Sequence, residues 1–173
     1  DDGMGRSPEV YIKEIAAGLV SMQELAEFLK LDESSQILAC SSSCVDAVDT
    51  VRHALRLCGS WMSSYPDFEK EMSEHVRTHY FEPDRFNGED ATMIVFNAAW
   101  ALKGLYRECD VRVVVELSQS DDWRQRLLAA FISSGMPSTS DPLIKEAKAR
   151  LRRDPFVSSQ GDHLIRMAAN GLP

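Results

Sequence analysis

The chain has 173 residues, of which 44% are hydrophobic and 27% charged, and its formal net charge is −8. This balance is ordinary for a globular protein and excludes a wholly disordered chain, a collagen and a disulfide-stabilised mini-protein. The longest apolar run, residues 127–132, has six members and is too short to cross a bilayer. The first residues lack the basic and apolar stretches of a secretory signal, so none is expected. Residue 1 is not Met, which suggests a fragment of a longer polypeptide.

Charge is distributed unevenly along the chain. Residues 1–90 hold 18 acidic and 8 basic side chains, a net charge of −10, whereas residues 91–173 hold 9 acidic and 11 basic ones, a net charge of +2. An acidic chain repels a nucleic-acid backbone overall, so any contact with one must be local. The cysteines, at positions 40, 44, 58 and 109, fall mostly in apolar helical stretches. That placement favours free thiols in a reducing compartment and predicts an intracellular protein, cytoplasmic or nuclear.

Three helices are predicted before residue 45. Ser7, Pro8 and Glu9 form a helix start, because Pro is favoured at the first helical position and Ser before it. The apolar side chains that follow predict one buried face, made of Val10, Ile15, Ala16 and Leu19. Ser21 and Glu24 have the spacing of a capping box, so a second helix, or a kink in the first, is predicted to begin at Met22 and to run to Lys30. The serine-rich residues 31–44 predict a short helix followed by a loop.

Longer helices are predicted in the middle of the chain. Residues 45–62 carry an apolar stripe, and Gly59 within them predicts a bend or a close crossing with another helix. Residues 64–80 form the next helix, and residues 82–90 have the composition of a loop. Residues 89–109 are apolar around most of a helix circumference, which places this helix at the centre of the fold.

The remaining elements are also predicted to be helical. The side chains of residues 111–117 alternate in type along the chain, in the pattern of a strand. A lone strand would leave its backbone N–H and C=O groups unpaired, so a helix capped by Asp110 is favoured. Residues 120–122 cap a helix over 123–134, and Asp141 with Pro142 starts another over 143–153. A short helix within residues 161–170 completes the chain.

These elements predict an all-α fold of seven or eight helices packed as antiparallel pairs. Either a closed helical bundle or a short HEAT- or armadillo-like stack fits their spacing, although no consensus residues recur. Residues 1–173 are interpreted as a single domain, in which residues 1–6 form a flexible tail.

Two pairs of side chains have a spacing compatible with zinc. Cys40 and Cys44 are four residues apart, as are His75 and His79, and two such pairs could form a tetrahedral site if they faced one centre. The 30 residues between the pairs far exceed the length of a zinc finger, so helix-surface histidines are the favoured interpretation. No cofactor is predicted.

One basic cluster interrupts the acidic chain. Five cations within nine residues have a single acid among them: Lys145, Lys148, Arg150, Arg152 and Arg153. Cations near a helix C-terminus are favourable without any function, but this cluster could also bind an acidic peptide, a phosphorylated segment or RNA. Arg124 and Arg126 could widen it. No aromatic side chain is interleaved with these cations, which makes RNA the weaker alternative.

The sequence contains no G-x-S-x-G, P-loop, G-x-G-x-x-G or H-E-x-x-H motif. We therefore expect a non-enzymatic protein-interaction domain, a scaffold or adaptor, that binds a peptide or partner helix through a groove between helices and the basic cluster. The alternatives are an RNA-associated regulatory module that uses residues 143–153 and a zinc-stapled helical domain. Self-association is also possible, because an open stack leaves terminal apolar faces.

Overall fold

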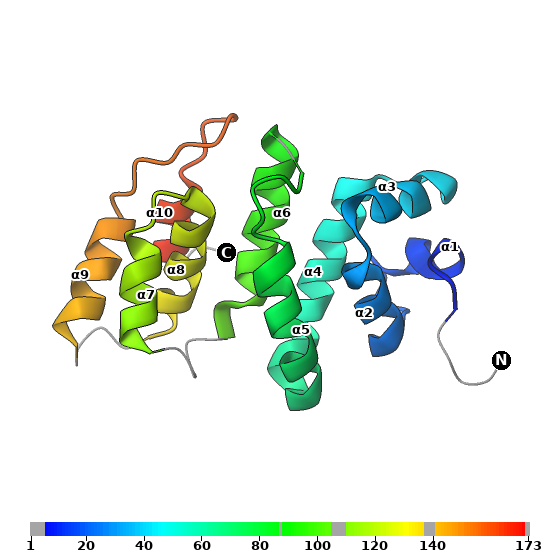
Figure 1. Cartoon of the computed structure of the whole chain (residues 1–173), viewed down its shortest axis with the longest axis horizontal. Coiled ribbons are helices and arrows are strands. Elements are labelled where there is room, and N and C mark those ends of the chain that lie inside the picture. Colours follow the sequence, from blue (N-terminus) through cyan, green and yellow to red (C-terminus); the bar gives the residue numbers. More distant parts are fainter. Residues whose placement is uncertain (1–5, 87, 105–109, 137–140, 172–173) are drawn as a thin grey trace. The chain divides into compact units, whose positions relative to one another are not determined.

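A computed structural model describes residues 6–86, 88–104, 110–136 and 141–171 of the chain. Within these ranges all regular structure is helical, which confirms the all-α prediction (Figure 1). The elements are α1 Pro8–Tyr11, the 3₁₀ helix η1 Ile12–Glu14, α2 Met22–Lys30, α3 Glu33–Ser42, α4 Ala47–Ser64, α5 Pro66–His79, α6 Gly88–Ala101, α7 Val111–Ser118, α8 Trp123–Ser134, α9 Pro142–Leu151 and α10 Leu164–Ala169. None of these helices is long and apolar enough to span a membrane.

The described residues hold more helices than predicted, ten α-helices in place of seven or eight. All ten lie in segments that the sequence predicts to be helical, so the difference is one of number and not of location; the shortest, α1 and α10, have four and six residues. The choice between a bundle and a repeat-like stack stays a prediction.

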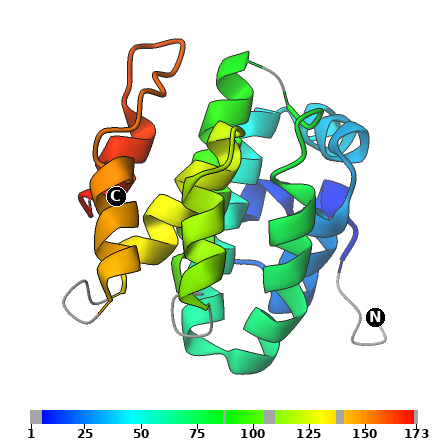
Figure 2. The same cartoon turned by 60° about the vertical axis from the view of Figure 1, so that its left-hand side comes forward.

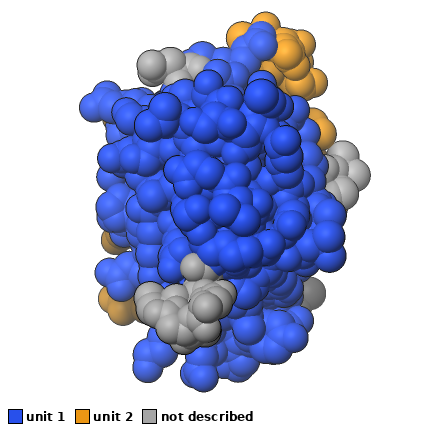
Figure 3. All heavy atoms as spheres, turned by 90° about the vertical axis from the view of Figure 1, so that its right-hand side faces the viewer, with its two compact units in different colours: residues 1–101 blue, residues 102–173 orange. Residues whose placement is uncertain are grey.

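The chain divides into two compact units, unit 1 from residues 1–101 and unit 2 from residues 102–173 (Figure 3). Residues 91–101 carry no charged side chain, so unit 1 has the net charge of −10 and unit 2 the net charge of +2 found for the two halves of the sequence. The acidic and the slightly basic parts of the chain are therefore separate structural units. The interpretation as one domain stays a prediction.

Unit 1 begins with less helix than the sequence predicts. The helix that starts at Pro8 ends at Tyr11 and continues only as the 3₁₀ turn η1. Gly18 then adopts a φ of +70°, a conformation that stops a helix and that side-chain-bearing residues rarely adopt. The predicted buried face is consequently wrong: Ile15 is buried, but Val10 and Leu19 are 60% and 68% exposed.

The second helix agrees with its prediction in both bounds and cap. Ser21 Oγ accepts a hydrogen bond from the Glu24 backbone N–H, and the Glu24 carboxylate accepts one from the Ser21 backbone N–H, which completes the capping box. Glu24 is buried, and Arg6 donates to its carboxylate from Nε at 2.9 Å and from the backbone N–H at 3.0 Å. Arg6 was placed in the predicted flexible tail, of which residues 1–5 lie outside the described residues.

The pairing of Glu24 with Arg6 predicts an acid-sensitive contribution to stability. The hydrogen bond from Arg6 holds the pKa of Glu24 at about 2, below the ordinary 4.5, although burial opposes this. Because the folded pKa is depressed, the stabilisation is complete above about pH 4.5 and is lost as the pH falls toward 2. Glu24→Gln should cost about 2 kcal/mol at pH 6 by urea unfolding, and much less at pH 3. Glu27→Gln, one turn along α2, is the control and should show little difference between the two pH values.

Helices α4 and α6 lie side by side in unit 1, coloured cyan and green in Figure 1 and Figure 2. A Cβ placed on Gly59 would lie 2.7 Å from Cζ3 of Trp100 and 2.8 Å from the Cα of Ala101. Only a residue without a side chain permits this approach, so the predicted close crossing at Gly59 is confirmed. The apolar residues Ile94 and Ala98 of α6 are 1% exposed or less, in agreement with a central helix. Residues 105–109 of the predicted helix, Cys109 included, lie outside the described residues.

In unit 2 the ambiguous residues 111–117 are helical, as predicted. The Asp110 carboxylate accepts a hydrogen bond from the Arg112 backbone N–H and so caps α7, which buries Val114. Asp122 and Asp141 cap α8 and α9 in the same way. Because each cap needs only neighbouring residues, all three helix starts could be located from the sequence.

Candidate functional site

Helix α9 carries the predicted basic cluster, and its local sequence determines where it begins. Pro142 occupies the first helical turn, and Asp141 Oδ1 accepts a hydrogen bond from the Leu143 backbone N–H at 2.8 Å. The helix buries one side against unit 2, through Ile144, Ala147, Lys148 and Leu151. Its basic residues are therefore divided between a buried and an exposed side.

Two of the five cations make hydrogen bonds to other segments of unit 2. Lys148 is only 6% exposed, and its Nζ donates a hydrogen bond to the backbone oxygen of Met136. Burial, with a contribution from Arg152, lowers its pKa. Arg150 is half-buried, and its guanidinium donates to Ser118 Oγ on α7 at 2.9 Å and pairs with Glu146 at 3.4 Å. Both side chains are therefore engaged in contacts within unit 2.

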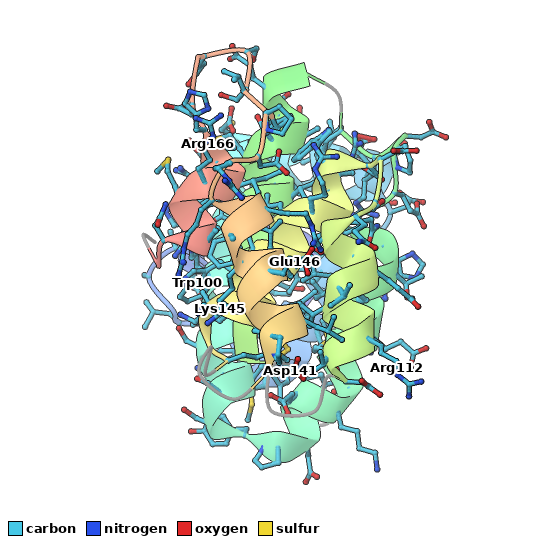
Figure 4. The ribbon with its side chains drawn as sticks, turned by 90° about the vertical axis from the view of Figure 1, so that its left-hand side faces the viewer. Trp100, Arg112, Asp141, Lys145, Glu146 and Arg166 are labelled. Atoms are coloured by element: carbon cyan, nitrogen blue, oxygen red, sulfur yellow. The ribbon has the colours of Figure 1, made fainter. Side chains whose placement is uncertain are left out.

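The other three cations, Lys145, Arg152 and Arg153, are exposed (Figure 4, where Lys145 is labelled on α9). Lys145 and Arg152 are seven residues apart and so share a helix face, with Arg153 beside them and Ala149 between. Within the described residues no carboxylate lies within salt-bridge distance of any of the three. We call Lys145, Arg152 and Arg153 the α9 basic face.

The two arginines of α8 do not extend this face. Arg126 forms an ion pair with the buried Asp154, at 2.8 Å between Nε and Oδ2. Arg124 lies at 4.8 Å from the centroid of the Trp123 ring and pairs with Asp122 at 3.3 Å. The prediction that these residues widen the basic cluster is therefore not supported by their contacts.

Asp154 organises the C-terminal part of unit 2, a role that the sequence did not reveal. Its carboxylate accepts hydrogen bonds from Arg126 and from the Phe156 backbone N–H, and its backbone oxygen accepts one from Nε of Arg166 at 2.7 Å. Asp154 therefore connects α8, the end of α9 and α10. In the sequence it is recognisable only as the residue before Pro155 that stops a helix.

The four candidate zinc ligands are not gathered at one centre. Among the described residues no group of three or more His, Cys, Asp or Glu side chains could hold a metal ion. Cys40 is buried and Cys44 exposed. His75 Nε2 lies 3.1 Å from the backbone oxygen of Leu29, at the C-terminal end of α2, and His79 lies 3.5 Å from Glu82. His75 thus serves as a cap for α2.

The buried thiols are also poorly suited to nucleophilic chemistry. Burial raises the pKa of Cys58 to about 12 and raises that of Cys40 as well. Because the thiolate is the reactive form, these side chains are inert at neutral pH.

The α9 basic face is thus the part of the predicted site that is exposed and, among the described residues, has no ion pair. Comparisons with protein-family models, with curated proteins and with solved structures give no match for this chain, so the assignment of a function depends on the residues described above.

Proposed function

We propose that this chain is a non-enzymatic protein-interaction domain, of the scaffold or adaptor kind, in which the α9 basic face binds an acidic segment of a partner protein. The observation that carries the proposal is the separation of the five predicted cations into two that are used inside unit 2 and three that are exposed without a carboxylate.

Charge complementarity identifies the kind of partner. Most other cations of unit 2 that the structure describes have acceptors within the unit, as Arg126 and Arg166 do at Asp154. Lys145, Arg152 and Arg153 have no carboxylate partner among the described residues, although Arg153 Nε donates to the backbone oxygen of Ala149 at 3.3 Å. Their charges create a local positive potential, which attracts carboxylates and accelerates their encounter. The middle of this face is Ala149, so a partner can approach the helix closely.

The contacts of the reactive side chains support a role in binding rather than catalysis. The Cys40 and Cys58 thiols are both buried within the packing of unit 1. A nucleophile needs a neighbouring base or a lowered pKa, and the pKa of Cys58 is instead raised.

Neutralising the α9 basic face should weaken binding of an acidic peptide. The variant Lys145→Gln/Arg152→Gln/Arg153→Gln should bind a fluorescent peptide rich in Glu and Asp about tenfold less tightly, since each exposed ion pair contributes a fraction of a kcal/mol. Fluorescence anisotropy at fixed ionic strength measures the dissociation constant. All three side chains are exposed, so helical circular dichroism should be unchanged.

The matched control removes the same charge from other exposed positions. Lys13→Gln/Lys70→Gln/Arg112→Gln has the same net charge as the test variant, so it should retain the affinity of the unmodified chain if position matters. Equal losses in both variants would show that only net charge acts and would overturn the proposal. Single-stranded oligouridine of the same charge as the peptide is the third probe. Tighter binding of the RNA than of the peptide, with a steep salt dependence, would contradict a protein partner and would favour RNA as the partner.

A further inference from the structure

Arg56 of α4 is held in one position within unit 1. Its Nε donates a hydrogen bond to Asn97 Oδ1 at 2.5 Å, and its guanidinium carbon lies 4.2 Å from the centroid of the Trp100 ring. Asn97 is itself 4% exposed and donates from Nδ2 to the Met93 backbone oxygen at 2.7 Å. Asn97 and Trp100 of α6 thus orient the guanidinium of Arg56, which belongs to α4.

The charge of Arg56 is not balanced by an acid. Among the described residues no carboxylate pairs with Arg56, and no acceptor is found for its two terminal amino groups. Arg126 in unit 2, by contrast, has the carboxylate of Asp154. A half-buried guanidinium has lost part of its hydration. A bound anion would provide the negative charge and the hydrogen-bond acceptors that the protein itself does not provide for Arg56. An arginine already fixed in position also loses little side-chain entropy on binding.

A second cation stands one turn away on the same face of α4. Arg52 is four residues before Arg56, and its positive charge is one of the causes that lower the pKa of Arg56, after burial. Its partner is Asp49, at 3.2 Å, and the two side chains are 34% and 60% exposed. Exposed ion pairs of this kind are weak, so Arg52 can exchange Asp49 for another anion. Adjacent like charges are unfavourable, and they are more so when one of them is half-buried.

We propose that Arg56, supported by Arg52, forms a binding site for a phosphate monoester on unit 1. A phosphate monoester carries close to two negative charges and three acceptor oxygens, so it can engage the fixed guanidinium of Arg56 through two N–H groups and Arg52 through the remaining oxygen. A carboxylate has one charge and two oxygens, and Arg56 alone would saturate it. The pair of arginines therefore favours phosphate over carboxylate. This site is separate from the α9 basic face and does not depend on the function proposed for it.

The test follows the Nε–H signals of the arginines by NMR in the full chain, at constant ionic strength, during titration with O-phosphoserine, inorganic phosphate or acetate. The Arg56 signal is expected to shift with a saturable curve for both phosphates and about tenfold more weakly for acetate, as the loss of one charge-assisted hydrogen bond implies. A phosphoserine that binds more tightly than inorganic phosphate would identify a phosphorylated side chain as the source, and equal affinities a free phosphate.

The following variants distinguish a phosphate site at Arg56 and Arg52 from a non-specific electrostatic attraction of anions. Arg52→Gln should weaken phosphate binding several-fold and leave acetate binding nearly unchanged, whereas Arg77→Gln, which removes another unit 1 arginine close to an aromatic ring, should affect neither. Arg56→Lys retains the charge but loses the planar fork, so it should abolish the preference for phosphate. A linear shift of Arg56 that is equal for all three anions would overturn the proposal, as would an Arg52→Gln variant with unchanged phosphate affinity.

Discussion

Replacing Asp154 by alanine should destabilise unit 2 by about 3–5 kcal/mol, the usual cost of removing one member of a buried ion pair. The Asp154 side chain is 5% exposed and that of Arg126 17%. Without the carboxylate, Arg126 would stay desolvated with only the backbone oxygens of Ser120 and Asp121 as acceptors. The Phe156 backbone N–H would lose its acceptor as well.

Hydrogen exchange resolved by peptide measures this effect in the full chain. Amides of α8, α9 and α10 should lose protection, whereas those of unit 1 provide an internal reference, so no assumption of two-state unfolding is needed. Asp162→Asn is the matched control, because it removes an exposed acid from the same segment and should leave protection unchanged. The double variant Arg126→Met/Asp154→Leu should recover part of the lost stability, since it removes both charges. Unchanged protection in Asp154→Ala would show that the ion pair contributes nothing.

Introducing a side chain at Gly59 should separate α4 from α6. Gly59→Leu is expected to cost about 3 kcal/mol, the upper part of the range for overpacking, because its Cβ would meet the backbone of Ala101 as well as the Trp100 ring. A flexible side chain could move aside, but the Cα of Ala101 can move only with its helix. Urea unfolding followed by tryptophan fluorescence gives the change in stability.

The sign of the change in stability on replacing Gly59 by alanine distinguishes a close crossing from a helix with free space around the glycine. Alanine in place of glycine stabilises a helix interior by about 1 kcal/mol when nothing opposes it. Gly59→Ala should therefore be neutral or destabilising only if the crossing is as close as 2.8 Å. Ser60→Ala, at an exposed neighbouring position of α4, controls for the effect of helix propensity. A more stable Gly59→Ala variant would contradict the packing of α4 on α6.

The success of sequence interpretation in this chain follows the range of the interactions involved. The start of α2 could be located from Ser21 and Glu24 because a capping box joins residues three apart. The same holds for α9, where Asp141 bonds to Leu143. The buried face predicted from Val10 to Leu19 was wrong because helical spacing matters only where a helix continues, and this one ends at Tyr11.

The candidate site illustrates what spacing cannot distinguish. Lys145, Lys148 and Arg152 belong to the predicted basic cluster, and helical geometry places them within about one-sixth of a turn of each other. Lys148 is nevertheless buried, and its Nζ donates a hydrogen bond to the backbone oxygen of Met136, two residues after the end of α8. Whether Lys148 is exposed or buried therefore depends on where the segment that contains Met136 lies, which the spacing of residues along α9 does not show.

The amino-acid sequence by itself determined that the chain is helical, where most of its helices begin, that its charge changes between its two parts, and that five cations lie close together on one segment. These properties depend on residues a few positions apart, whose relative geometry a helix already specifies. Only the tertiary structure decided which cations are exposed, that Asp154 joins three helices, and that Arg56 lies on Trp100 without an acid. Those contacts join residues 12 to 44 positions apart, and the burial that sets their energies exists only once the helices have packed.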